Sequence, residues 1–555
     1  MKISSSKLLI ETLLFENVEF IFGYPGGAVL NIYDAIYLSK MKHILVRHEQ
    51  AAVHMADGYS RSSKNIGVII VTSGPGYTNC ITGISTSNFD NSSIILICGQ
   101  VVKKLIAQNS FQELDNLNIS NSIIKNFYSI NCFYNIQYII YKSFKKNNYI
   151  KKGPIIIDFP KDLTSNINIL RNKYPFIKKK INKKYIFLKI KFNRPIILFG
   201  GGIKNLNFFL INKFINCIKI PFISSIMGIG YFNYRSIYYL NWLGMHGEAF
   251  TNFIIHFCDL IICLGSRLDD RITNNNNKFC PYSKIIHIDI NLNSISKNIF
   301  CKNFFIINIK NFLKKKIYFK NIKIWWKFII FIKKFFKNKY KNNFFFCKSQ
   351  QIIEFIYLIS KGKLIVTTDV GQHQMFAAKY YNYNYKSFIT SGGLGTMGFG
   401  FPAAIGVKFS NKNKKILLIT GEGSFQMMMQ ELSTCKQYKI NIIIINLNNQ
   451  SLGMVKQWQE LNYSNRYSSS YIYSLPNFKF LINSYNFYSF NFYKIKNFYY
   501  FFNKLILFDI FCFINIYVIQ NENVFPIQIF NKSMCEFIHF FSIKKYEKKI
   551  LFFNI

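Results

Sequence analysis

The sequence predicts an α/β protein made of three doubly wound parallel-sheet domains. The chain has 555 residues, and single hydrophobic cores stop growing beyond roughly 250–300 residues, so several domains are expected. Short, continuous runs of β-branched and apolar residues alternate with helical patterns, which is typical of parallel sheets covered by helices on both faces. Glycine or small polar residues follow many of these runs, as they do at the ligand-binding edge of an open α/β sheet.

The predicted strands fall into three groups along the chain. The first group is 67–72, 94–99 and 155–159, the second is 195–199, 260–264 and 285–290, and the third is 364–368, 416–420 and 442–447. Two basic segments of low complexity, around 165–193 and 309–349, contain no glycine-marked strand ends and separate these groups. We therefore expect domains over residues 1–165, 190–310 and 350–535, with 311–349 as a basic linker.

The chain is strongly basic, with 70 Lys and Arg residues against 25 Asp and Glu, which gives a formal net charge of +45. Such a charge would suit a nucleic acid or an anionic membrane. However, Lys is enriched together with Asn, Ile, Phe and Tyr in stretches such as 178–184 and 312–348, while the glycine-rich motifs are spared. This pattern indicates drift in an A+T-biased bacterial or organellar genome, and no nucleic-acid module is recognisable. We expect no nucleic-acid partner.

The sequence also predicts a cytoplasmic protein without a membrane segment. The 12 cysteines form no Cys-x-x-Cys pairs, which favours reduced thiols. The chain opens on a helical pattern over 6–15 rather than on a targeting segment. The apolar stretch 498–520 contains Asn503, Lys504, Asp509 and Asn515, whose burial in lipid would be costly. We interpret that stretch as a buried helix and strand.

The most informative motif lies between residues 416 and 450. An apolar strand is followed by Gly-Glu-Gly-Ser-Phe from residue 421, then by a helical pattern, a second apolar strand and the amide pair Asn448 and Asn449. The acidic turn and the amide pair should meet at one sheet edge. Glu422 and Asn449 are therefore candidate ligands for a divalent cation such as Mg²⁺ that bridges two phosphates.

This motif resembles the signature of thiamine-diphosphate enzymes, in which a Gly-Asp-Gly turn precedes an Asn-Asn pair. Glu422 is one methylene longer than the Asp of that signature. The resemblance implies that thiamine diphosphate, with Mg²⁺, is bound at this edge. The diphosphate-binding residues that it implies are Gln372, His373, Gly423 and Ser424.

Two further segments resemble the same family. The stretch 47–59, Arg-His-Glu-Gln-Ala-Ala-Val-His-Met-Ala-Asp-Gly-Tyr, resembles its N-terminal motif and implies that Glu49 is the catalytic carboxylate that contacts the aminopyrimidine ring. The stretch 72–79 resembles the loop that approaches that ring, with Gly74, Pro75 and Gly76. The glycine-rich stretch 390–400 resembles the segment whose methionine, here Met397, supports the folded cofactor.

Narrower motifs resemble acetolactate synthase. They include Phe-Gln-Glu from residue 111, Gly-Met-His-Gly from 244, Ser-Arg-Leu-Asp-Asp-Arg from 266 and Gly-Met-Val-Lys-Gln-Trp from 453. The resemblance implies that Gln112 is a second catalytic residue, and that Arg271 pairs with a substrate carboxylate, for which a planar guanidinium is well suited. The full set of substrate-binding residues that it implies is Phe111, Lys161, Met245, Arg271, Met454, Val455 and Trp458.

The resemblance further implies FAD in the central domain, although the condensation contains no obvious redox step. A glycine run after a strand is weak evidence by itself. Lys151 stands where the family has Arg, so we expect reduced affinity for FAD. The FAD-binding residues implied are Lys151, Gly200, Gly201, Gly202, His246, Arg267 and Asp289.

The implied activity is that of an acetolactate synthase catalytic subunit. Such an enzyme decarboxylates pyruvate on thiamine diphosphate and condenses the hydroxyethyl carbanion with a second 2-oxoacid, either pyruvate or 2-oxobutyrate. This is the first common step of valine, isoleucine and leucine biosynthesis. Glu49 of one subunit would meet the diphosphate site of another, so a homodimer or larger assembly is expected, and a regulatory small subunit is compatible. The alternatives are a degenerate, noncatalytic cofactor-binding scaffold and a related 2-oxoacid decarboxylase or oxidase.

Overall fold

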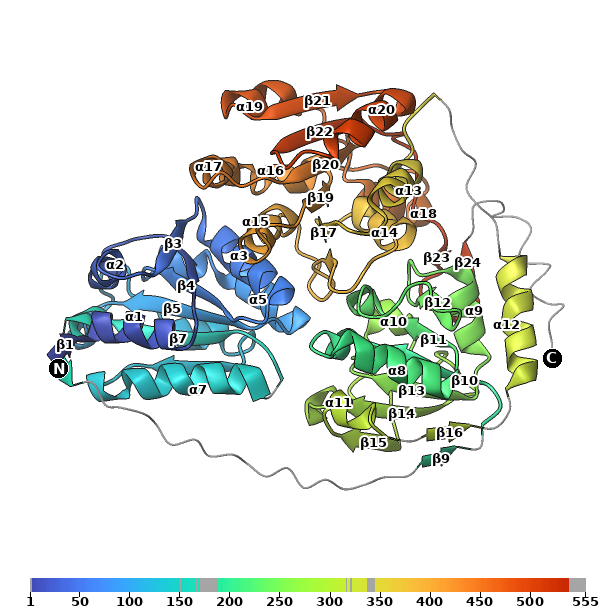
Figure 1. Ribbon diagram of the computed structural model, residues 1–555, viewed down its shortest axis with the longest axis horizontal. Helices are drawn as coiled ribbons and strands as arrows, with labels where there is room; N and C mark the ends of the chain where they lie inside the picture. Colours follow the sequence, from blue (N-terminus) through green and yellow to red (C-terminus); the bar gives the residue numbers. More distant parts are fainter. Residues whose placement is uncertain are drawn as a thin grey trace.

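The computed structural model describes residues 2–149, 151–165, 167–169, 188–190, 192–315, 317–319, 322–336 and 345–538. Three six-stranded parallel sheets, each flanked by helices, form three domains (Figure 1). This arrangement confirms the predicted fold class. The basic stretch 178–184 and most of the segment predicted to separate the first two domains lie outside the described residues.

The N-terminal sheet has the strand order β3-β2-β4-β5-β7-β6. Its strands β4, β5 and β7 are buried along their whole length, which explains why they read as continuous apolar runs. The strands are β2 (Phe20–Gly23), β3 (Lys42–Leu45), β4 (Gly67–Val71), β5 (Ile94–Gln100), β6 (Asn126–Ser129) and β7 (Ile155–Pro160). The main helices are α1 (Ser5–Phe15), α2 (Leu30–Tyr37), α3 (Glu49–Ser62), α4 (Pro75–Thr78), α5 (Ile81–Asp90), α6 (Asn116–Ser120) and α7 (Ile136–Tyr149).

The central sheet has the order β12-β11-β10-β13-β14-β15. In order of appearance this is 3-2-1-4-5-6, the order of dinucleotide-binding domains. The strands are β10 (Pro195–Phe199), β11 (Phe222–Ser224), β12 (Tyr239–Trp242), β13 (Leu260–Leu264), β14 (Lys284–Asp289) and β15 (Asn303–Ile306). Its helices are α8 (Phe208–Ile218), α9 (Ala249–His256), α10 (Asp270–Thr273) and α11 (Ile309–Phe312).

Helix α12 (Lys323–Phe335) belongs to the central domain, although its residues were expected to be linker. Trp325, Ile329 and Ile332 of this helix are buried in the same hydrophobic cluster as Ile196 of β10. The indole N–H of Trp325 donates to the carbonyl of Pro195 at 3.3 Å. The Lys-rich composition concealed an amphipathic pattern, because its long side chains occupy only the solvent face.

The C-terminal sheet has the order β18-β17-β19-β20-β22-β21, which repeats the relative order of the N-terminal sheet. The strands are β17 (Ile365–Thr368), β18 (Phe388–Ile389), β19 (Ile416–Thr420), β20 (Ile443–Asn448), β21 (Tyr488–Phe492) and β22 (Cys512–Tyr517). The helices are α13 (Ser349–Ser360), α14 (Gln372–Tyr380), α15 (Gly400–Ser410), α16 (Glu422–Gln426), α17 (Leu432–Gln437), α18 (Gly453–Asn462), α19 (Phe478–Ser484) and α20 (Ile495–Leu505).

Short two-stranded pairings complete the structure. They are β1 (Lys2–Ser4) with β8 (Ile167–Ile169), β9 (Leu188–Ile190) with β16 (Ile317–Phe319), and β23 (Ile527–Gln528) with β24 (Phe537–Ile538). In the stretches that the structure describes, no helix has both the length and the apolar character needed to cross a lipid bilayer. The 12 cysteines are all free, as expected from their spacing.

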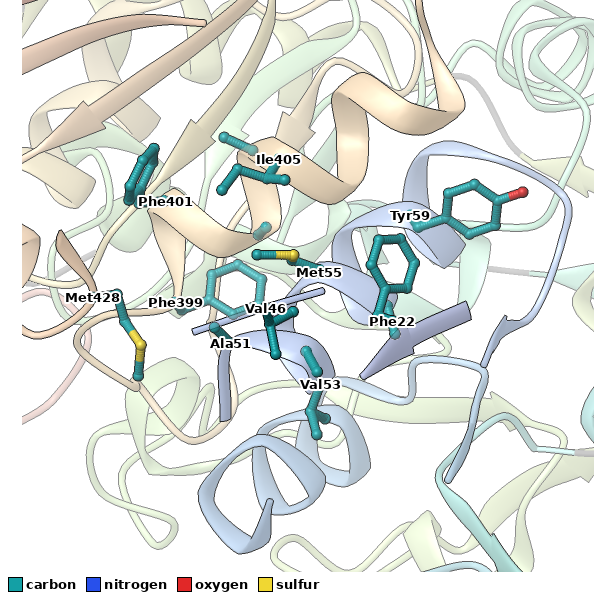
Figure 2. Packing of buried hydrophobic residues seen from close by; sticks show 14 of the residues in the cluster. Phe22, Val46, Ala51, Val53, Met55, Tyr59, Phe399, Phe401, Ile405 and Met428 are labelled. Carbon is teal, nitrogen blue, oxygen red and sulfur yellow. The ribbon is translucent and has the colours of Figure 1, made fainter. Parts of the chain in front are cut away.

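Helices α3 and α15 join the N-terminal and C-terminal domains through a shared core. Met55 and Val53 of α3 pack in one buried cluster with Phe399 and with Ile405 of α15 (Figure 2). A Cβ atom at Gly58 or at Gly406 would overlap the backbone of the facing helix. These two positions therefore need glycine, because only a glycine lets the two helix backbones approach so closely.

Candidate active site

A small cavity of about 90 Å³ lies at the carboxyl ends of β17, β19 and β20. These loops and helix starts follow buried strands, which is where doubly wound sheets bind ligands. Many of the residues expected at the cofactor and metal site converge here. The lining includes Gln372, His373, Met397, Glu422, Gly423, Ser424, Asn449, Met454 and Val455.

Glu422 and Asn449 lie side by side in this cavity. The N–H of Ser451 donates to Glu422 Oε1 at 2.9 Å and to Asn449 Oδ1 at 3.1 Å, so both oxygens surround one backbone group. Glu422 is buried, and burial raises its pKa to about 7. A bound cation would favour the charged carboxylate. The pair supplies two oxygens of the kind that Mg²⁺ prefers.

The same cavity fits an anionic group. His373 Nε2 and Ser451 Oγ are buried and have no hydrogen-bond partner among the described residues. Helices α14 and α18 begin at Gln372 and Gly453, so two helix N-termini meet at the cavity, an arrangement that favours phosphate. Burial lowers the pKa of His373 to about 3, which leaves a neutral imidazole. The residues present therefore fit a diphosphate.

A second group of expected residues surrounds Glu49, the first residue of α3. The amide of Asn79 donates to Glu49 Oε2 at 2.9 Å. A Cβ atom on Gly76 would lie 2.8 Å from the methyl group of Thr72 and 3.7 Å from Glu49 Oε1, so this glycine is needed for its close packing against Thr72, next to the carboxylate. Gly74, with a φ of +60°, has the left-handed conformation that favours glycine, and it packs against Gln112. Pro75 begins α4 directly after it.

The start of α3 is held by the C-terminal domain of the same chain. The N–H of Arg47 donates to Glu431 Oε1 at 2.9 Å, and Thr434 Oγ1 donates to Glu431 Oε2 at 2.6 Å. The N–H of Leu45 donates to the Tyr438 hydroxyl at 2.8 Å. Glu431 is fully buried, and burial raises its pKa to about 7. These contacts fix the backbone immediately before Glu49.

The Glu49 group is nevertheless separate from both cavities within one chain. In the described part of the chain, Glu49, Gly76 and Gln112 line neither the small cavity nor the larger one described below. Phe111 is 88 % exposed, and Lys161 is exposed at the end of β7. The single chain therefore brings these expected residues into one domain but does not join them to the small cavity.

The larger cavity, of about 1260 Å³, lies where the central domain meets the other two. It collects most residues that were expected to bind FAD and several that were expected to bind substrate. Met397 and Met454 line both cavities, so the two sites adjoin. The expected residues in its lining are Lys151, Gly201, Gly202, Met245, His246, Arg267, Arg271, Asp289, Met397, Met454 and Trp458.

Gly200 is the expected glycine that does not line this cavity. A Cβ atom at Gly200 would overlap the backbone of Gly265 and Ser266, in the turn after β13. This glycine therefore allows two strand-end turns of the central sheet to pack closely.

The electrostatics of the large cavity are mixed. Burial lowers the pKa of His246 to about 3, so this imidazole is neutral, and burial also lowers the pKa of Lys151. Arg267 Nη1 donates to the carbonyl of Phe89 at 2.8 Å, which ties the central domain to α5. Arg271 is exposed to the cavity, and its Nη1 lies 3.2 Å from the sulfur of Met245. Arg271 also forms an exposed ion pair with Asp270 at 3.6 Å, so its guanidinium lies at the cavity with a carboxylate partner in solvent.

Two residues at this site were missed in the sequence. Asp369 is fully buried, and its Oδ1 accepts the N–H groups of Val370 and Gly398 at 3.1 and 2.8 Å. It therefore couples the end of β17 to the segment that carries Met397. Its place directly after a predicted strand was a usable signal. Gln457, which is also fully buried, gave no such signal.

Comparisons with known proteins agree with this geometry. Three family models match the chain: the N-terminal TPP binding domain of thiamine pyrophosphate enzymes over residues 3–119, their central domain over 190–315, and their C-terminal TPP binding domain over 369–514. Each match falls on one of the three parallel sheets.

Curated relatives match almost the whole chain. The acetolactate synthase large subunit of Buchnera aphidicola subsp. Schizaphis graminum is 41 % identical, covering 96 % of this chain and 98 % of the relative. That of Haemophilus influenzae is 41 % identical over 97 % and 98 %. The isozyme 3 large subunit of Escherichia coli is 38 % identical over 87 % and 88 %. The chain therefore belongs to the acetolactate synthase large-subunit family of thiamine pyrophosphate enzymes.

Proposed function

We propose that this chain is the catalytic subunit of an acetolactate synthase, which decarboxylates pyruvate and joins the remaining two-carbon unit to a second 2-oxoacid. The observation that carries this proposal is the junction of the two cavities. Residues that fit a diphosphate and a divalent cation line the small cavity, and Met397 and Met454 connect it to the large cavity, which contains Arg271 and Trp458. A cofactor site and a substrate pocket are thereby adjacent.

In the small cavity, Glu422 and Asn449 would hold Mg²⁺, and the N-termini of α14 and α18 with His373 would hold the diphosphate. Thiamine diphosphate, when bound, would supply a thiazolium ring that has an acidic carbon and acts as an electron sink for a carbanion. The role of Glu49 is to hold a proton at its carboxylate against the aminopyrimidine ring, with Asn79 fixing the other carboxylate oxygen.

In the large cavity, Arg271 would pair with the carboxylate of the second 2-oxoacid, because a guanidinium offers two parallel donors to a carboxylate. Met245 and Trp458 would shape the pocket around its alkyl group and thereby set the choice between pyruvate and 2-oxobutyrate. Phe111, Gln112 and Lys161 lie outside this cavity in one chain. They would join it from a partner subunit.

FAD would occupy the part of the large cavity beside the central sheet. The strand order of that sheet is the dinucleotide-binding order, and Gly201, Gly202 and Asp289 lie at its carboxyl edge. Lys151 would meet the phosphates as a point charge, where an arginine would offer a planar fork.

The assembly would be a homodimer or larger, in which Glu49 of one subunit completes the small cavity of another. Two observations support this arrangement. In the described part of one chain the Glu49 group lines neither cavity, and Phe111 is exposed. The relatives are large subunits, which favours a separate regulatory small subunit for this chain too.

The test is product analysis with purified protein, pyruvate, thiamine diphosphate, Mg²⁺ and FAD. We expect acetolactate as the main product, and loss of at least about 100-fold in rate for Glu49→Gln, because a positioned proton-transfer group contributes about 10²–10⁴-fold. Glu19→Gln, at an exposed carboxylate that lines neither cavity, is the matched control. Acetaldehyde as the main product would indicate a decarboxylase, and no turnover of pyruvate by cofactor-loaded protein would indicate a scaffold.

A further inference from the structure

Gln457 is a buried amide whose orientation is fixed by the backbone. It lies on α18, its exposed fraction is 0 %, and it faces the C-terminal segment. Its Oε1 accepts the N–H of Val524 at 2.9 Å, while its Nε2 donates to the carbonyl of Val524 at 2.9 Å. A backbone N–H can only donate and a carbonyl can only accept, so this pair allows one orientation of the amide.

This orientation is transmitted to Asn449 through Gln372. The Nε2 of Gln372 donates to Gln457 Oε1 at 3.0 Å, which places the Oε1 of Gln372 on the opposite side. That oxygen accepts Asn449 Nδ2 at 3.2 Å. The Oδ1 of Asn449 consequently turns away from Gln372 toward Ser451 and Glu422. We name this Val524–Gln457–Gln372–Asn449 series the amide relay.

The amide relay favours one orientation of the Asn449 side chain, and a metal site with an asparagine ligand requires one orientation. An asparagine amide has an oxygen and a nitrogen of nearly the same size, and only the oxygen can bind a hard cation. The fully buried Gln457 shares no atom with the small cavity and does not line it. The hydrogen bonds from Gln457 toward the cation site run through Gln372 to Asn449.

We propose that Gln457 is a positioning residue for the divalent cation: acting through Gln372, and together with the N–H of Ser451, it holds the oxygen of Asn449 toward the metal. This inference rests on the proposed role of Glu422 and Asn449 as ligands. Residues that orient metal ligands typically contribute about 10–100-fold to metal affinity. Removal of the Gln457 amide frees Gln372 to rotate, and Asn449 can then present its NH₂ group to the cation.

The experiment is a Mn²⁺ titration, followed by electron paramagnetic resonance, of purified protein in the presence of thiamine diphosphate. Gln457→Met keeps the volume of the side chain and removes both polar atoms. Gln457→Glu keeps the acceptor for Val524 N–H and Gln372 Nε2. Gln459→Met, on the same helix, serves as the control, because it removes an amide that bonds the carbonyl of Ser468 and takes no part in the amide relay. Thermal unfolding of each variant is measured in parallel.

We expect Gln457→Met to weaken Mn²⁺ binding about 10–100-fold, with Gln459→Met unchanged. Gln457→Glu should stay within about threefold of the wild type in Mn²⁺ affinity while it lowers the melting temperature, because it buries a carboxyl group against a carbonyl. If affinity instead follows the melting temperature through the series, or if Gln457→Met binds as tightly as the wild type, the proposal is wrong. Absence of Mn²⁺ binding in the wild type would instead refute the metal site itself.

Discussion

The two halves of the proposed catalytic site differ in how completely one chain builds them. In the C-terminal half, Glu422, Asn449 and His373 converge on one cavity. In the N-terminal half, Glu49 is held by Asn79 and flanked by Gly76, yet in the described residues this group lines neither cavity. The N-terminal half is therefore held in place by hydrogen bonds but is separate from both cavities.

This difference shows that one chain can hold a group of site residues in place and still leave the site incomplete. Contacts from Glu431 and Tyr438 fix the backbone before Glu49 from within the same chain. In the described part of the chain, this group is left without a surface over Phe111, whose side chain is 88 % exposed. A second subunit can supply that surface, and a symmetric dimer would then contain two shared sites.

The largest expected effect is the recovery of activity in mixed dimers, which tests whether the two halves of the site come from different chains. Glu49→Gln and Glu422→Gln chains should each be inactive alone. When unfolded together and refolded, they should regain about a quarter of the wild-type acetolactate rate, because half of the dimers are mixed and each mixed dimer keeps one intact site of two.

The control is the same mixture made from chains that carry both substitutions, which should stay inactive. Recovery of no activity by correctly assembled mixed dimers would mean that Glu49 acts on the small cavity of its own chain.

A pH experiment tests whether Glu431 stabilises the backbone before Glu49. We call this contact of Glu431 with Arg47 the clamp. Burial raises the pKa of Glu431 from 4.5 to about 7, so the folded chain holds its proton more tightly than the unfolded chain. The contribution of this group to stability is therefore full below pH 4.5 and declines as pH rises to about 7, by up to about 3 kcal/mol.

Glu431→Gln keeps an acceptor for the N–H of Arg47 and cannot titrate. Between pH 5 and 8, its melting temperature should fall less than that of the wild type. Thermal unfolding across this range measures the difference, and Glu11→Gln, at an exposed carboxylate on α1, is the control. Parallel curves for Glu431→Gln and the wild type would exclude the clamp.

The smallest expected effect is on Mn²⁺ affinity in the C-terminal half of the site. Glu422→Asp restores the shorter acid of the family signature but draws the carboxylate away from the N–H of Ser451. We expect Mn²⁺ affinity to fall about tenfold, since a hydrogen bond to a charged group contributes about 1.5–3 kcal/mol. The same titration used for Gln457 measures it. Tighter binding by Glu422→Asp would show that the longer acid is a defect of the site.

The meeting of Glu422 and Asn449 could be predicted from the sequence because it depends on local structure. Glu422 and Asn449 follow two strands that are neighbours in the sheet, and parallel neighbours bring their carboxyl ends together. The motif around Glu49 was equally recognisable. The separation of Glu49 from the two cavities could not be predicted. The position of the start of α3 depends on contacts between residues distant in sequence, such as that of Glu431 with Arg47.

Composition concealed other features. Helix α12 lies in a segment whose Lys-rich sequence suggested a linker, although Trp325 and Ile329 are buried. Gln457 is one amide in a chain rich in polar residues, and only its two bonds to Val524 distinguish it. Periodicity could have revealed the helix, whereas the amide relay required coordinates.

The shared core of α3 and α15 has a consequence for synthesis on the ribosome. The face of α3 that carries Met55 packs against residues of the segment 399–407, which is made after roughly 340 further residues. At about 5–20 residues per second, that interval is roughly 20–70 s. During this time the nascent N-terminal domain exposes an apolar helix face, so its production should depend on chaperones that protect emerging chains.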